Sequence, residues 1–499
     1  ARDHHGHTAL YYYIDSKICA FAYSKKAILA LSEIPRRLNE TRLAHILTRW
    51  QYNLEHTLYE GIFHLLSANT LIVTPERVEQ STYWFPEDLP PRHFKSQQDY
   101  AEGLLDVLQQ AVRSRLRSHQ PVSISLSGGL DSGSVAALAA AQLKIQGQSL
   151  RAFTSVPYYR ETIPLMAGRV ADETPWVEAI AKTAGNIDVH YLPSRHIGPL
   201  TANQKLLDLA IEPDRTFGNG YWLTDMYQQA NQQGFGTLLT GGVGNLTVSW
   251  AGDIASLPAR HLLRLGAWKQ LLRYKLLRPL LPPQIEAWHD HWRSQSSLED
   301  HFTFMNAEFI QRVNLKEAMK AADYTLTFTM PRHRNPQQQR WNMIQPRRDS
   351  RLSVEAEISA GFNLDIRDPT LDTRVIEYCA TIPDAVYRTP NGEARSLIRQ
   401  ALAGRLPTKV LENQTRGFQA IDLSQRLRHD HLAVKAAFAK IEDIQGYIGQ
   451  FINVSQLQTL WQTFSETSSL TFAHHIQADT LLHKLTVALC LVRFQQGDS

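Results

Sequence analysis

Apolar and polar positions between residues 96 and 240 alternate as they do in chains that build a parallel sheet covered by helices. Residues 122–126 predict a buried strand, and residues 135–143, rich in alanine and free of breakers, predict a helix soon after it. A preceding helix, expected to be capped near Ser96, carries an apolar stripe. The stripe consists of Leu104, Leu105, Leu108, Val112 and Leu116.

The same alternation continues further along the chain. The expected strands are residues 151–156, 188–192 and 236–239, and the expected helices are residues 175–184 and 222–232. This order predicts an α/β fold with a doubly wound parallel sheet. Beyond Trp250 the pattern is almost entirely helical, and no internal repeat is visible.

The first 90 residues have a different pattern, with short alternating runs between polar helical segments. The expected strands are residues 10–14, 18–23 and 70–74, which predicts a small α+β unit. The proline-rich, charged stretch 85–92 has the composition of a linker. We therefore expect two domains, residues 1–90 and 96–499. Because residues 10–14 have no upstream strand to pair with, we also expect that a further segment precedes residue 1.

Composition narrows the class of protein without identifying it. With 43% hydrophobic and 20% charged residues, the chain is ordinary for a soluble globular protein. A net charge of +4 gives no reason to expect a nucleic-acid partner, and no apolar run is long enough for a membrane span. Cys19, Cys379 and Cys490 have no metal-ligand spacing, and three unpaired thiols predict a reducing, cytoplasmic location.

A glycine-rich loop, residues 127–133, joins the first strand to the alanine-rich helix. Glycines at this junction let backbone amides approach a phosphate, and the helix N-terminus adds a positive dipole. The loop is neither a mononucleotide P-loop nor a dinucleotide fingerprint. Asp131 places a carboxylate beside the expected phosphate, which requires a divalent cation between the two charges. The alternative is an ordinary Ser/Gly turn that caps a helix.

The string Ser127-Gly128-Gly129-Leu130-Asp131-Ser132 resembles the pyrophosphate loop of the asparagine synthetase family. Four more segments resemble that family in the same order along the chain. They are residues 2–12, 238–245, 367–372 and 391–399. The resemblance implies an α+β sandwich remnant of a glutaminase domain in residues 1–90, without glutaminase activity, and an amide synthetase domain in residues 96–499.

The resemblance also implies a reaction, its cofactors and a set of site residues. ATP, with Mg²⁺, activates a carboxylate as an acyl-adenylate, and an amine captures it with release of AMP. Ser127, Gly128, Gly129 and Ser132 are expected to bind pyrophosphate, and Asp131 to hold magnesium. The remaining nucleotide-site residues are expected to be Leu126, Val156, Gly241 and Gly244.

This sequence departs from the family pattern at several positions. Asn245 stands where an aspartate ligates magnesium, so the metal should bind more weakly. Arg395 occupies the position of a catalytic lysine and can stabilise charge but not act as a base, with an ion pair on a helix surface as the alternative. Gly242 replaces a side chain that handles the substrates. Asp365 matches a family carboxylate and is the candidate that orients or deprotonates the amine, with a simple salt bridge as the alternative.

These departures, together with residues 416–422, resemble the divergent branch that includes lasso peptide cyclases. That likeness implies macrolactam closure between an Asp or Glu side chain and the N-terminal amine of a precursor peptide, with a leader peptidase and a leader-binding protein as partners. Glutamine-dependent asparagine synthesis, a small-molecule ligase similar to the β-lactam synthetases, and a scaffold without turnover stay open. Asparagine synthetases use an N-terminal cysteine to release ammonia from glutamine. No cysteine heads this chain, so either that cysteine lies in a segment before residue 1 or glutaminase activity is lost.

Two further features have alternative interpretations. His4, His5 and His7 resemble a metal cluster, but we expect a solvated turn there because no further ligand is evident. Residues 261–281 place basic side chains among leucines. We expect a basic amphipathic helix packed on the domain, with a membrane surface or an acidic peptide as alternative partners.

Overall fold

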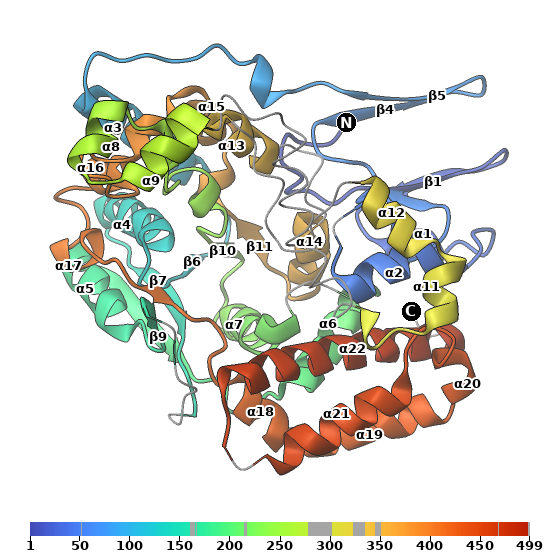
Figure 1. Cartoon of the computed structure of the whole chain (residues 1–499). Helices are drawn as coiled ribbons and strands as arrows, with labels where there is room; N and C mark the ends of the chain where they lie inside the picture. Colours follow the sequence, from blue (N-terminus) through green and yellow to red (C-terminus); the bar gives the residue numbers. More distant parts are fainter. Residues whose placement is uncertain are drawn as a thin grey trace.

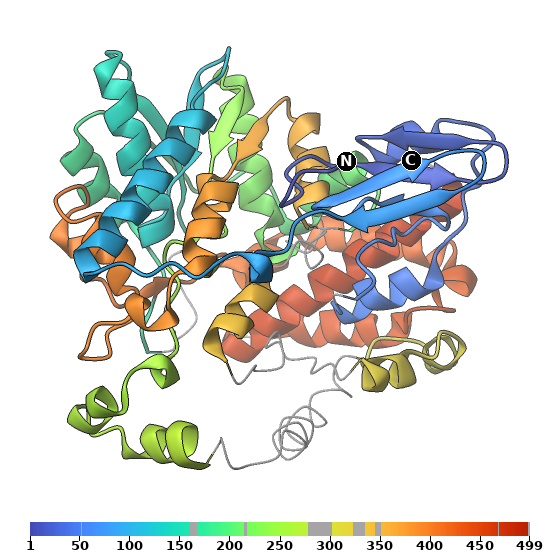
Figure 2. The same ribbon diagram turned by 90° about the horizontal axis from the view of Figure 1, so that it is seen from above.

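The structure of the chain is a computed structural model that describes residues 1–50, 52–159, 165, 167–213, 217–277, 302–322, 335–344, 351–467 and 469–497. Figure 1 shows a parallel sheet with its helices in one half of the molecule, and N-terminal strands above C-terminal helices in the other. Seen from above, the N-terminal hairpins lie at the far end from the first helices of the sheet domain (Figure 2).

The central sheet has five strands in the order β11-β10-β6-β7-β9, and every neighbouring pair is parallel. The strands are β6 (Val122–Ser125), β7 (Leu150–Ser155), β9 (Ile187–Leu192), β10 (Thr237–Leu239) and β11 (Asp365–Arg367). The predicted parallel α/β sheet is confirmed. The sequence predicts helices almost throughout beyond Trp250, and β11 is an exception, because a strand of three residues is too short to show a period of two.

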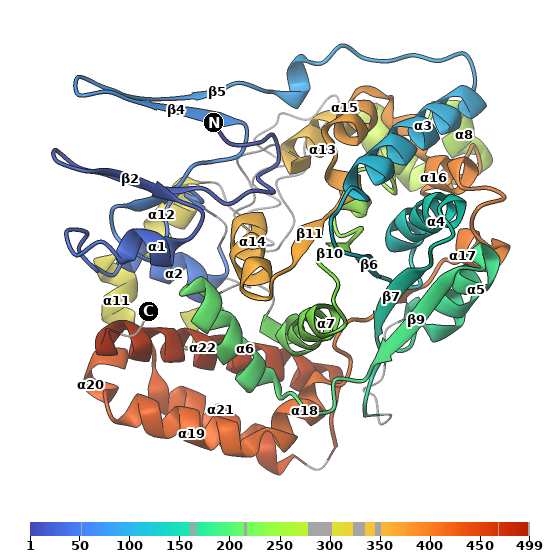
Figure 3. The same cartoon turned by 180° about the vertical axis from the view of Figure 1, so that it is seen from behind.

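Helices cover both faces of this sheet (Figure 3). One face packs against α3 (Gln97–Arg115), α4 (Leu130–Ile145) and α5 (Thr174–Ala184). The other packs against α6 (Pro199–Ala210), α7 (Gly220–Gln232) and α14 (Arg351–Gly361). Leu238 and Leu239 enter opposite cores, as adjacent strand residues do.

The predicted start of α3 is confirmed by a capping box. The Ser96 hydroxyl accepts the Asp99 backbone N–H at 3.1 Å, and the Asp99 carboxylate accepts the Ser96 N–H at 3.0 Å. Two later helices, α15 (Thr373–Thr381) and α16 (Ser396–Ala401), pack on α3 and extend this core.

The N-terminal unit contains an antiparallel sheet with the order β2-β1-β3. Its elements are β1 (Tyr11–Ile14), β2 (Cys19–Ala22), β3 (Ile62–His64), the hairpin β4 (Asn69–Val73) and β5 (Val78–Thr82), and the helices α1 (Lys25–Leu29) and α2 (Glu40–Thr48). The central strand β1 therefore pairs on both sides with strands that follow it. The predicted α+β character of this unit is confirmed.

The N-terminal unit shares its hydrophobic core with later parts of the chain. Residues of β1 and α2 belong to the same buried cluster as α6 and the long C-terminal helix α22 (Phe472–Gln496). Two buried ion pairs cross the same boundary: Lys25 with Glu357 of α14, and Arg42 with Glu212 at 3.0 Å. The packing therefore holds the first segment against the sheet domain.

Residues 259–277 form short pieces instead of the single amphipathic helix that was expected. They are α8 (Ala259–Arg264), α9 (Trp268–Gln270) and the π-helical η5 (Leu271–Leu277), and Gly266 separates the first two with φ +63°. Leu262 is buried, but Trp268 is 59% exposed, so the expectation of a packed helix is wrong for much of this stretch. Residues 278–281 lie outside the described residues.

None of the helices in the described ranges combines the length and the apolar character that a membrane crossing requires.

Candidate active site

Two glycine loops meet where the parallel strands β6 and β10 end. The first, residues 126–129, leads into α4, and the second, residues 240–244, leads into the short 3-10 helix η3 (Gly244–Leu246). A Cβ atom on Gly241 would lie 2.8 Å from the Asp131 carbonyl carbon, and one on Gly244 would lie 2.3 Å from Asp131 Oδ1. Glycine is required at both positions because the loops pack against each other without room for a side chain.

Hydroxyl groups hold the first loop in shape. Ser132 Oγ accepts the backbone N–H of Ser127 at 3.0 Å, and the two serine hydroxyls lie 2.9 Å apart. Helix α4 begins after Gly129, and no side chain caps its first amides. An uncapped helix N-terminus beside two hydroxyls is a favourable place for a phosphate group. The predicted anion-binding geometry is therefore present.

Asp131 lies in the first turn of α4 and faces the second loop. Its Oδ1 atom is buried, and no group in the described residues makes a hydrogen bond to it. Burial raises the pKa of Asp131 to about 6, and Asp368 adds to this rise, while Ser249 and Arg395 oppose it. A buried oxygen without a partner fits a divalent cation, since Mg²⁺ commonly takes one or two carboxylates and completes its shell with phosphate and water. The residues present therefore fit magnesium at Asp131.

Asn245, the second predicted metal ligand, already has a partner. Arg395 Nη2 donates a hydrogen bond of 2.7 Å to Asn245 Oδ1. Arg395 has a left-handed backbone, φ 62°, and directly precedes α16. The side-chain oxygen of Asn245 is thus shared with a guanidinium, which disfavours a nearby cation. Its predicted role as a metal ligand stays a prediction.

The two aspartates of the β11 segment have different surroundings. Asp365 begins the strand and accepts a hydrogen bond of 2.7 Å from Arg367 Nε, as the salt-bridge alternative anticipated. Asp368 follows the strand, is buried, and accepts the Val243 N–H at 3.0 Å. The sequence prediction did not single out Asp368, although the Asp-Pro step at residues 368–369 is a local signal for a turn. The catalytic role of Asp365 stays a prediction.

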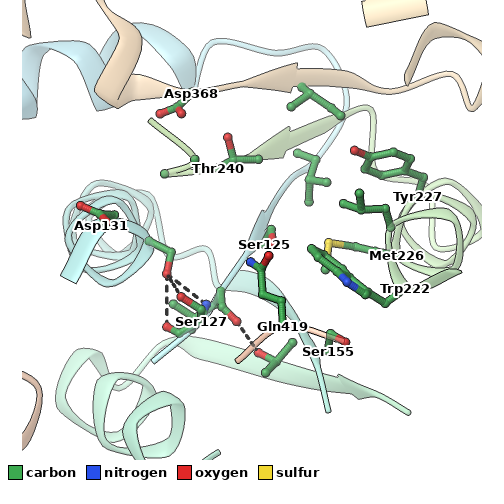
Figure 4. A pocket seen from close by; sticks show the side chains of 18 of the residues that line it. Ser125, Ser127, Asp131, Ser155, Trp222, Met226, Tyr227, Thr240, Asp368 and Gln419 are labelled. Atoms are coloured by element: carbon green, nitrogen blue, oxygen red, sulfur yellow. Dashed lines mark hydrogen bonds between the residues drawn. The ribbon is translucent and has the colours of Figure 1, made fainter. Parts of the chain in front are cut away.

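One cavity of about 480 Å³ gathers most of the predicted residues. Figure 4 shows Asp368 and Thr240 at one side, Asp131 and Ser127 near the first loop, and Trp222, Met226 and Tyr227 along another wall. The predicted residues that line it are Leu126, Ser127, Gly129, Asp131, Ser132, Val156, Gly241, Asn245 and Asp365. Gly128 and Gly244 lie behind this wall: a Cβ atom on Gly128 would meet Trp176 at 2.7 Å.

Segments beyond the two loops complete the cavity. Residues 417–422, part of the string that motivated the comparison with the divergent branch, lie along its wall. Gly417, the first of these residues, forms β12 (Arg416–Gly417) with Arg416, and β12 pairs with β8 (Arg169–Val170) in a small parallel ladder. Most of the string 416–422, which resembles the divergent branch, therefore lies at the candidate site.

The histidines near the N-terminus form a turn, but the expectation that they are solvated is wrong. His5 is 8% exposed and packs against Trp84, with ring centroids 5.1 Å apart. His7 lines the cavity, and its buried Nε2 atom has no hydrogen-bond partner among the described residues. Within the described residues no three His, Cys, Asp or Glu side chains are grouped so that they could hold a metal ion.

Fold and site together define an α/β protein in which two glycine loops meet at the ends of parallel strands. Residues 103–483 match the family model described as asparagine synthase, and residues 1–84 match that of a glutamine amidotransferase domain. The chain belongs to the asparagine synthase family, which confirms the predicted family. The narrower likeness to lasso peptide cyclases stays a prediction.

Curated proteins that are similar to this chain include an asparagine synthetase and two amidases. The chain is 23% identical over 424 residues to the glutamine-hydrolyzing asparagine synthetase 3 of Bacillus subtilis, which covers 82% of this chain and 63% of the relative. It is 33% identical over 201 residues to an amidase of Penicillium rubens and 32% identical over 200 residues to an amidase of Gibberella zeae. Each amidase match covers 38% of this chain and 28% of the amidase.

Proposed function

We propose that the chain joins a carboxylic acid to an amine in two steps that use ATP. In the first step a carboxylate oxygen attacks the α-phosphorus of ATP, and pyrophosphate leaves. In the second step the amine nitrogen attacks the acyl carbon of the acyl-adenylate, and AMP leaves. The observation that carries the proposal is the meeting of the two glycine loops at the strand ends, with the uncapped α4 and the partnerless oxygen of Asp131 at one cavity wall.

The described residues have defined tasks in the first step. Backbone amides at the start of α4 bind the pyrophosphate oxygens, and Ser127 and Ser132 keep that loop in the binding shape. Asp131 would hold magnesium, which when bound supplies positive charge to the leaving pyrophosphate. Leu126 and Val156 line the cavity as apolar contacts for the adenine. Fixed donors of this kind stabilise charge that develops in the transition state.

The finer proposal is macrolactam closure within a precursor peptide, in the manner of lasso peptide cyclases. Residues 417–422, whose likeness to that branch motivates it, line the cavity. Trp222, Met226 and Leu352 offer apolar surface to peptide side chains, and the carboxylates Glu355 and Asp365 favour a positively charged amine. A leader peptidase and a leader-binding protein of the same pathway are the proposed partners, and the cytoplasm is the proposed location.

A second candidate is asparagine synthesis with ammonia from glutamine. It is supported by the glutamine amidotransferase match of residues 1–84 and by the name of the Bacillus subtilis relative. The two candidates differ in both substrates. Asparagine synthesis uses free aspartate and glutamine, whereas macrolactam closure uses an Asp or Glu side chain and the N-terminal amine of the same peptide.

One assay separates these candidates. The 499-residue chain is incubated with ATP, Mg²⁺ and either L-aspartate with glutamine, L-aspartate with ammonium, or synthetic peptides that each carry a free N-terminus and one Asp or Glu. Pyrophosphate and AMP are quantified, and peptides are tested for loss of one water by mass. A cyclised peptide supports macrolactam closure, and asparagine supports the second candidate. Absence of pyrophosphate release with every substrate would contradict the ligase proposal and favour a scaffold.

A further inference from the structure

The N-terminal loop that carries His7 is fixed against the sheet domain. Asp3 Oδ1 accepts the backbone N–H groups of His5 and His7, each at 3.1 Å. The buried guanidinium of Arg2 donates to the Gly6 carbonyl at 2.8 Å and to Ser353 of α14 at 2.6 Å. These contacts tie the loop to itself and to the synthetase part of the chain. His7 is therefore held in place by its surroundings.

His7 lies where two cavities adjoin. It lines the large cavity with the glycine loops, and it also lines a neighbouring cavity of about 430 Å³ between the N-terminal loop and the β11 segment. Tyr23, Asp365 and Ile366 line both cavities as well. The N-terminal unit thus contributes an ionisable side chain to the cavity that Gly242 and Asp368 also line.

The charges around His7 suit a group that gains and loses a proton. The groups that influence it are Asp3 in its own loop, Asp365 and Asp368 at the two ends of β11, Arg115 at the end of α3, and His5. Burial lowers the pKa of His7 below its ordinary value, so the imidazole is neutral near pH 7 and has a free lone pair. The three carboxylates favour the imidazolium once it forms, as the buried aspartate does in a catalytic triad.

We propose that His7 accepts the proton of the attacking amine in the second step. As the amine nitrogen forms its bond to the acyl carbon, an N–H proton moves to the imidazole, and the bond from the acyl carbon to the AMP oxygen breaks with its electron pair. Amide, AMP and imidazolium result, and the imidazolium later releases its proton to water. This inference rests on the proposed amide-forming activity and assigns the base for its second step.

The test separates the two steps with variants His7→Ala and His7→Gln. The substrate is whichever member of the aspartate and peptide panel releases pyrophosphate with the unmodified chain. Acyl-adenylate formation is followed by pyrophosphate release and by trapping with hydroxylamine, a nucleophile that is uncharged near pH 7 and needs no protein base. We expect both variants to keep hydroxamate formation within about threefold, while amide formation with the native amine falls by about 10²–10⁴-fold.

A pH profile and a matched variant complete the test. Protonation of the attacking amine lowers the rate of amide formation at low pH in every variant. The unmodified chain should show a further fall as the pH drops through the His7 pKa, and this further fall should be absent in His7→Gln. His4→Gln changes a histidine in the same loop that lines only the neighbouring cavity, and should leave both rates within about twofold.

The outcomes that overturn the inference differ from those that overturn the function. Equal losses in both steps, an unchanged rate of amide formation in the His7 variants, or a His4→Gln loss as large as theirs would show that His7 is not the base. Failure of the unmodified chain to release pyrophosphate would instead contradict the proposed function.

Discussion

The guanidinium of Arg395 donates a hydrogen bond of 2.7 Å from Nη2 to the side-chain oxygen of Asn245. The sequence predicts that both positions depart from the family pattern, and they are 150 residues apart. Their contact indicates that the departures are linked. Asn245 lines the cavity, and the guanidinium of Arg395 places a permanent positive charge beside this neutral amide.

A double-mutant cycle should show that Asn245 and Arg395 act together. We expect Asn245→Ala, Arg395→Ala and the double variant to give a non-additive effect of about 0.5–3 kcal/mol on kcat/KM for ATP, because Asn245 orients the charge that Arg395 offers to the phosphates. Pyrophosphate release at several ATP concentrations gives the values. Simple additivity of the two single variants would mean that the contact does not matter for turnover.

Gly244→Ala should damage the site without unfolding the protein. The new Cβ atom would lie 2.3 Å from Asp131 Oδ1, so the carboxylate must move, and a displacement of about 1 Å can cost roughly 10²-fold in rate. Gly242→Ala is the matched control, since its Cβ atom would meet nothing closer than 3.6 Å. We expect pyrophosphate release to fall at least tenfold further in Gly244→Ala. Similar losses in both variants would contradict this steric argument.

Asp131→Asn should make the protein more stable and less active. Because burial raises the folded-state pKa of Asp131 from 3.8 to about 6, the native state binds a proton more tightly than the unfolded state, and wild-type stability falls as the pH rises between these values. The variant avoids the buried charge. At pH 7.5 we expect about 1–3 kcal/mol more free energy of unfolding than in wild type, and little difference below pH of about 4.

Urea unfolding at both pH values measures this difference. Asp106→Asn, on the outer face of α3, is the control and should change stability by less than about 0.5 kcal/mol. A stability gain that persists unchanged at low pH would show that ionisation of Asp131 is not its cause. Loss of Mg²⁺-dependent pyrophosphate release in Asp131→Asn is expected in parallel.

The buried pair of Lys25 and Glu357 should matter for the attachment of the N-terminal unit. Lys25→Met leaves the Glu357 carboxylate buried without its cation, and such losses typically cost about 3–5 kcal/mol. The double variant Lys25→Met with Glu357→Gln removes both charges and should recover most of the lost stability. Thermal unfolding of the wild type and the two variants tests this, and a double variant no better than Lys25→Met would refute the explanation.

The sequence by itself was enough to predict the parallel sheet, the glycine-rich loop before α4 and the family. Strand β6, the loop before Asp131 and helix α4 are consecutive, so apolar periodicity and glycine placement within about 25 residues are enough to define them. The capping box of α3 is equally local. Such features depend on backbone conformation and on neighbours a few residues away.

Only the tertiary structure decided what surrounds that loop. The closeness of Gly244 to Asp131, the hydrogen bond from Val243 to Asp368 and the place of His7 on the cavity wall join segments that are more than 100 residues apart in the chain. Whether such segments meet depends on strand order and on shared cores. A histidine turn near residue 7 therefore looks solvated in the sequence and becomes part of a site only once the N-terminal unit packs against β11 and α14.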